Sequence, residues 1–110
     1  MTRKTPALLP LPTGKTPPPP GHLQAPEKAL WHELTGSHEF DDPASLALLR
    51  TALESHQRAR RCREAIDKDG EAVRDRWGQI KGHPLLAAER DARASFLSAM
   101  RLLNLDVADR

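Results

Sequence analysis

The stretch DDPASLALLRTALESHQRARRCREAIDKDG, residues 41–70, decides the fold of this chain because it predicts one long helix. Asp42 is a favourable N-cap, Pro43 suits the first helical turn, and Gly70 suits the end of a helix. Between these residues, apolar side chains recur at spacings of three and four, the period of a helix with one buried face. We therefore expect a helix over residues 43–68, about 39 Å long.

The expected helix is apolar only in its first half. Leu46, Leu49 and Leu53 form one stripe, but from Arg58 onward the same face carries the basic run RARRCR. We expect the first half to pack in a core, and the second half to project from it or to line a surface.

Two further helices are expected, one on each side of the long one. A helix over residues 26–35 begins at Pro26 and carries Trp31 on its apolar face. A second apolar stripe predicts a helix over residues 84–103, followed by Asn104, which tolerates the left-handed conformation that closes a helix.

Residues 71–83 break the helical pattern. Val73 and Ile80 are β-branched, and the residues Asp-Arg-Trp-Gly at 75–78 can turn, which predicts a short β-hairpin with Trp77 near its tip. A loop is the alternative, because an isolated hairpin is marginally stable. The expected fold is mainly α: a short helix, a long helix, a small β-hairpin and a C-terminal helix, after a proline-rich tail.

That tail covers residues 1–21 and holds seven of the ten prolines, so we expect it to be disordered and the helical domain to span residues 22–110. It carries Arg3, Lys4 and Lys15 and no acidic residue, which suits contact with a polyanion. Its PPPP run could bind an aromatic groove, although a stiff spacer is the interpretation that we favour.

The composition indicates one small domain that depends on a partner. A chain of 110 residues has room for one domain, and its four aromatic side chains make a weak core. We expect other copies of the chain to complete the burial of the second and third helices.

The single cysteine, Cys62, excludes an internal disulfide, and no apolar run is long enough for a membrane span or a signal peptide. A cytosolic protein is expected.

No pattern of catalytic or metal-binding residues is present in the sequence. Cys62 has no base on its own helix face, since His56 lies six residues away on a different face. The five histidines form no zinc-binding spacing, and the chain has no glycine-rich phosphate loop. We therefore expect neither an enzyme nor a site for a metal or a cofactor.

The basic run is the sharpest candidate for a binding surface, because arginines on one helix can contact DNA phosphates. Together with the tail, the candidate DNA-binding residues are Arg3, Lys4, Lys15, Arg58, Arg60, Arg61 and Arg63. The alternative is a solvated helix whose arginines pair with acids four residues away. Those pairs would be Arg50–Glu54, Arg58–Glu54, Arg60–Glu64 and Arg63–Asp67, which leaves only Arg61 without such an acid.

The residues expected to pack in the core or between subunits are apolar or aromatic side chains of the expected helices and of the hairpin tip. They are Trp31, Leu46, Leu49, Leu53, Trp77, Phe96, Met100 and Leu103.

The order of these segments resembles the small-subunit family of tailed-phage terminases over residues 17–107. The resemblance rests on PEKALWHEL, DDPASLALLRTALESHQRA, GEAVRDRWGQIKGHP and PLLAAERDARASFLSAMRLLNLD, in that order. Relatives close the last helix with a Leu-Gly-Leu-like end, where this chain has Asn104. The resemblance implies a ring-forming, non-enzymatic homo-oligomer in the host cytoplasm. It would bind double-stranded viral DNA and present it to the large subunit, which carries the ATPase and nuclease.

One departure from the family bears on how DNA is bound. Many small subunits begin with a helix-turn-helix, which residues 1–25 cannot form. Weak, salt-sensitive and mostly non-specific binding is therefore expected. Two alternatives stay open at this point: a small dimeric helical DNA-binding regulator unrelated to packaging, and an adaptor that presents the PPPP run to a partner.

Overall fold

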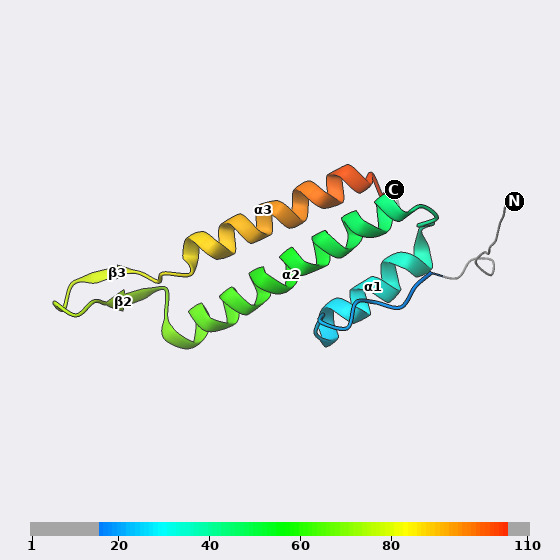
Figure 1. Cartoon of the computed structure of the whole chain (residues 1–110). Helices are drawn as coiled ribbons and strands as arrows, with labels where there is room; N and C mark the ends of the chain where they lie inside the picture. Colours follow the sequence, from blue (N-terminus) through cyan, green and yellow to red (C-terminus); the bar gives the residue numbers. More distant parts are fainter. Residues whose placement is uncertain (1–15, 106–110) are drawn as a thin grey trace, which may run out of the picture.

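Three helices and one hairpin make up residues 16–105, the part of the chain that the computed structural model describes (Figure 1). In chain order the elements are α1 (Ala25–Ser37), α2 (Pro43–Asp69), β2 (Ala72–Arg74), β3 (Ile80–Gly82) and α3 (Leu86–Leu103). The prediction of a mainly helical fold with a small hairpin is confirmed. No helix in the described part is long and apolar enough to cross a membrane.

The long helix α2 lies where its end signals predict it. The carboxylate of Asp42 accepts hydrogen bonds from the backbone N–H of Ser45 at 3.1 Å and from the Ser45 hydroxyl at 2.8 Å. These bonds satisfy a first-turn N–H that has no partner within the helix. At the other end, Gly70 has a φ of +92°, which residues with a side chain rarely adopt.

Helices α2 and α3 lie side by side and run in opposite directions (Figure 1). Small or compact side chains line their contact, which lets the helices approach closely. The buried residues are Ala52, Ala59, Cys62 and Ile66 on α2, and Ala92 and Ala99 on α3. The burial continues past Ala59, so the expectation that the second half of α2 lies outside a core is wrong. Much of the apolar surface that we expected other copies to cover is buried within one chain.

Helix α1 packs against the first half of α2 and completes the main apolar cluster. The buried members of that cluster are Leu23, Trp31, Phe40, Leu49 and Leu53. Partly buried residues pack around them, namely Leu30, Leu34, Leu46, Leu103 and Leu105. The cluster therefore joins both ends of the described chain to the beginning of α2.

The proline run is held against α1 by a hydrogen bond. The indole N–H of the buried Trp31 donates to the backbone oxygen of Pro17 at 3.2 Å, and the Leu23 N–H donates to the oxygen of Pro20 at 3.2 Å. A buried indole N–H needs such an acceptor. Residues 16–21, which we assigned to a disordered tail, thus lie along the helical domain. Residues 1–15 of that tail are outside the described part.

The hairpin and the end of α3 follow their sequence signals. Strands β2 and β3 pair in antiparallel register, with Val73 opposite Lys81, and they extend beyond the helices at one end of the molecule (Figure 1). Trp77 at the tip is 72 % exposed, so it does not pack on this chain's own core. Asn104 has φ 54° and ψ 44°, the left-handed conformation predicted for it. Helix α3 begins at Leu86, after a turn that the sequence pattern placed inside the helix.

Candidate nucleic-acid interface

The four candidate arginines of the basic run divide into two that are paired inside the protein and two that are exposed. Arg60 and Arg63 are partly buried and belong to the first group, whereas Arg58 and Arg61 belong to the second. The other candidates, Arg3, Lys4 and Lys15, lie outside the described residues. The division follows from which side of α2 each residue occupies.

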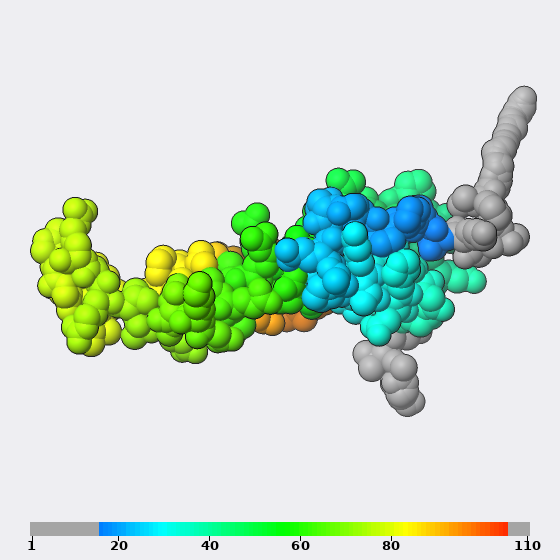
Figure 2. Space-filling model, turned by 90° about the horizontal axis from the view of Figure 1, so that it is seen from below, coloured from blue at the N-terminus to red at the C-terminus, as the bar shows by residue number. Residues whose placement is uncertain are grey.

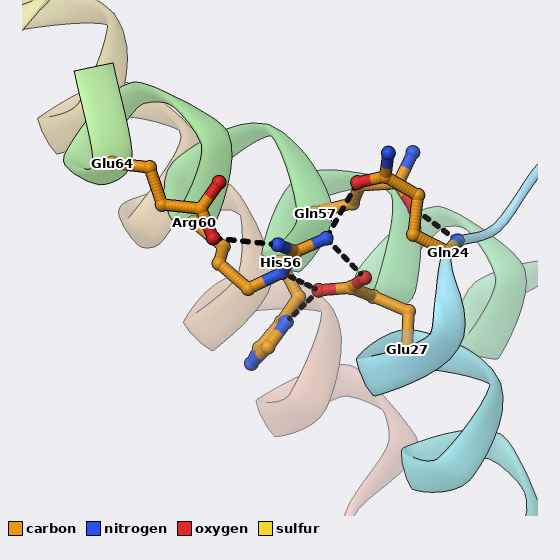
Figure 3. Close-up of polar contacts among 6 residues, drawn as sticks. All are labelled: Gln24, Glu27, His56, Gln57, Arg60 and Glu64. Carbon is orange, nitrogen blue, oxygen red and sulfur yellow. Dashed lines mark hydrogen bonds and ion pairs between the residues drawn. The ribbon is translucent and has the colours of Figure 1, made fainter.

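Arg60 is held by a buried carboxylate from α1 (Figure 3). Glu27 is fully buried, and its two oxygens accept from the Nε and Nη2 of Arg60, each at 2.9 Å. The Nδ1 of His56 lies 2.7 Å from Oε2 of Glu27. Two parallel hydrogen bonds between a guanidinium and a carboxylate are a strong, directional arrangement. This ion pair ties α1 to the middle of α2.

Two of the three remaining N–H groups of Arg60 are also occupied. Its Nη1 donates to Glu64 at 2.8 Å, and its Nη2 donates to the side-chain oxygen of Gln24 at 2.6 Å. Gln57 accepts the backbone N–H of Gln24 at 2.6 Å and so fixes the start of α1 (Figure 3). Four of the five N–H groups of Arg60 are therefore engaged within the protein, and a phosphate would have to compete with these bonds.

The buried pair shifts the acidity of both partners. Burial raises the pKa of the Glu27 carboxyl, but the hydrogen bonds and positive charges of Arg60 and His56 outweigh it, and the net pKa lies below the ordinary value of 4.5. The hydrogen bond to Glu27 raises the pKa of Arg60. The carboxylate is thus ionised in the folded protein at neutral pH.

Arg63 is surrounded by carboxylates from three elements of the chain. Its Nε lies 3.1 Å from Asp67 on α2, while its Nη2 and Nη1 lie 3.4 Å from Glu71, before β2, and from Glu89 on α3. Glu89 also accepts from Arg93 at 2.6 Å. Arg63 therefore joins the two long helices at the base of the hairpin, which is a structural role.

Arg58 and Arg61 are exposed, and within residues 16–105 neither forms an ion pair or a hydrogen bond through its side chain. Spacings of three and seven residues place them on one face of α2 with the exposed Lys68. The acid on that face, Glu54, is instead bound by Arg50 at 3.4 Å and by His22 at 2.7 Å. The expected Arg58–Glu54 pair does not form.

These three residues, Arg58, Arg61 and Lys68, make a basic stripe on the solvent side of α2. Arg58 and Arg61 line an open groove whose other walls come from His22 before α1 and Leu85 before α3. A row of cations beside a groove can bind phosphates without first breaking an internal ion pair.

Sequence reasoning missed the role of Glu27, although a signal for it was present. Glu27 precedes Leu30 by three residues and Trp31 by four, so it lies on the apolar face of α1. A carboxylate on a buried face needs a cationic partner from another element. The local pattern could not identify that partner, because Arg60 lies thirty-three residues further along the chain.

The described residues contain no group of three or more His, Cys, Asp or Glu side chains that could hold a metal ion. Cys62 is a buried free thiol, and His56 packs edge-on against Phe96 with ring centroids 5.1 Å apart. Burial accounts for Cys62, and the contacts with Glu27 and Phe96 account for His56.

Comparison with known families decides the identity. A family model described as phage terminase, small subunit, matches residues 28–110, from the first turn of α1 onward. The chain belongs to this family. Terminase small subunits are non-catalytic adaptors for packaging phage DNA, which agrees with the sequence-based expectation. Neither the curated proteins nor the solved structures gave a match.

The buried ion pair generates a prediction about stability and pH. Glu27→Gln removes the charge that Arg60 faces and lowers the free energy of unfolding by about 1–3 kcal/mol at neutral pH. Because folding lowers the pKa of Glu27, its stabilising contribution is complete above about pH 4.5 and is lost as pH falls through the folded pKa. Urea unfolding from pH 7 to pH 3 should therefore show the two proteins converging at the acid end.

Glu64→Gln is the matched control, since the Glu64 side chain is 63 % exposed and faces the same arginine. This substitution should lower the free energy of unfolding by less than about 1 kcal/mol. Two results would refute the assigned role of Glu27. One is a loss of unfolding free energy for Glu27→Gln that is no larger than for Glu64→Gln. The other is a difference in unfolding free energy between Glu27→Gln and wild type that is the same at pH 3 as at pH 7.

Proposed function

We propose that this small terminase subunit binds double-stranded viral DNA and presents it to the large ATPase and nuclease subunit in the host cytoplasm. Membership of the family supports the packaging role. The observation that carries the DNA contact is the basic stripe of Arg58, Arg61 and Lys68, which internal carboxylates leave free.

The stripe suits the phosphate backbone rather than base recognition. Ten residues of helix separate Arg58 from Lys68, a rise of about 15 Å. Cations along a straight rod can follow several phosphates and release their counterions, which gives salt-dependent and sequence-tolerant binding. The arginines of the stripe come from a helix that is fixed on both sides, by α1 and by α3, so little ordering is needed on contact.

We further propose that the working form is a ring of several copies. Leu97 and Leu102 on α3 remain 53 % and 71 % exposed, which is apolar surface that a neighbouring copy can cover. A ring would also line up one basic stripe per copy against the same DNA molecule and so raise the overall affinity.

Native mass spectrometry of the full chain tests the assembly. A ring appears as one species of many copies, whereas a dimer would favour a small DNA-binding regulator over a packaging adaptor. A stable single copy at micromolar concentration would contradict both.

The DNA contact is tested by replacing the exposed arginines. Arg58→Ala combined with Arg61→Ala should weaken binding to a short duplex and reduce the slope of log K against log salt by about 2, one unit for each lost phosphate contact. The matched control is Arg90→Ala with Arg101→Ala, which removes two exposed arginines from α3. If both double variants lose the same amount of DNA affinity, only net charge matters and the stripe is not the contact.

A further inference from the structure

The hairpin displays two large apolar side chains to solvent at the end of the molecule. Trp77 is 72 % exposed and Ile80 is 65 % exposed. In Figures 1 and 2 the hairpin extends past the ends of α2 and α3, away from α1. An apolar patch on a projecting element is a candidate surface for contact with another molecule.

The turn that carries Trp77 is held by a network of hydrogen bonds. One carboxylate oxygen of Asp75 accepts the N–H groups of Trp77 and Gln79, each at 2.9 Å. The backbone oxygen of Asp75 accepts from Gly78, which has φ +82°, and Arg74 donates to the oxygen of Gly78 at 2.7 Å. These bonds hold the turn together while the indole of Trp77 stays exposed.

The base of the hairpin is fixed to the helices as well. His83 is 7 % exposed; its Nδ1 accepts the Leu85 N–H at 3.0 Å, so its Nε2 carries the proton and donates to Asp69 at 2.9 Å. Glu71, which precedes β2, is bound by Arg63 of α2. The hairpin is thus attached to the helices by the residues that flank both of its strands.

The charge at the tip is positive. The guanidinium of Arg76 lies 4.7 Å from the centroid of the Trp77 ring, a cation–π contact that leaves the opposite face of the indole open. Arg74 and Lys81 add two more cations. The acidic residue among them, Asp75, accepts hydrogen bonds from the turn and pairs with Lys81 at 3.4 Å. The exposed tip therefore combines an aromatic face with unbalanced positive charge.

This combination favours a nucleic acid over a second copy of the chain. Trp77 and Ile80 together offer at most roughly 400 Å² of apolar surface. A stable protein–protein interface buries about 800 Å² on each partner. By contrast, a groove of duplex DNA accepts a two-stranded β-ribbon, and an apolar side chain can insert at a base step while arginines bind phosphates.

We propose that the hairpin tip enters a groove of duplex DNA, with Trp77 against the base edges and Arg76 on the phosphate backbone. This contact rests on the proposed DNA-packaging function and adds a second surface to the basic stripe of α2. The basic stripe comes nearest to the hairpin at Lys68, which is next to the C-terminal residue of α2, where the chain enters the hairpin.

The test measures binding of the full chain to a short fluorescein-labelled duplex by anisotropy, over a range of salt concentrations. Trp77→Ala should weaken binding roughly 5- to 100-fold, and Trp77→Phe should keep most of the affinity because it keeps an aromatic face. Arg76→Gln should reduce the salt slope by about 0.9. Arg90→Gln, which removes the charge of a side chain that is 75 % exposed on α3, is the control and should bind as wild type. Circular dichroism checks that each variant keeps its helices.

The outcomes separate this contact from the function on which it rests. If wild type binds the duplex and the Trp77 and Arg76 variants bind equally well, the hairpin contact is wrong and the packaging proposal stands. If those variants keep DNA affinity but lose copies in native mass spectrometry, a second copy covers the tip and the contact is again wrong. If wild type itself fails to bind duplex DNA at low salt, both proposals fail together.

Discussion

Close packing of α3 along α2 is the constraint on which the rest of the structure depends. Small residues at the contact, such as Ala52, Ala59 and Ala99, let the two helices lie against each other for most of their lengths. This packing decides which side of α2 faces the protein and which faces solvent. It also brings the two ends of the hairpin together, since β2 follows α2 and β3 precedes α3.

The same constraint sorts the arginines of the basic run by function. Arg60 and Arg63 lie on the sides of α2 that α1 and α3 cover, and there each meets carboxylates that would be costly to bury alone. Arg58 and Arg61 lie on the uncovered side, where no acid of residues 16–105 binds them. A run that looks uniform in the sequence therefore contains two structural and two accessible charges.

The sequence predicted those parts of the fold that local signals control. Asp42 and Gly70 mark the ends of α2, Asn104 marks the end of α3, and the turn before Gly78 marks the hairpin. Among the predicted ion pairs four residues apart, three form, and Arg58–Glu54 does not.

Features of the fold that depend on contacts between distant segments could not be predicted from the sequence. The acceptor for the Trp31 indole comes from the proline run, and the partner of Glu27 comes from α2. Burial of the second half of α2 was missed because alanine and cysteine at the contact give a weak apolar pattern, whereas the arginine side chains beside them dominate it. The proposed hairpin contact with DNA and the proposed assembly likewise involve other molecules, which local sequence signals do not describe.

On the proposed function, internal ion pairs decide which arginines reach DNA. Arginine-selective modification of the full chain, with and without duplex DNA and read by mass spectrometry, tests it most directly. We expect Arg58 and Arg61 to react readily in the free protein and to be protected by DNA. Arg60 and Arg63 should react slowly in both states. Ready reaction of Arg60 and Arg63 in the free protein, with protection of these two by DNA and none of Arg58 and Arg61, would contradict it.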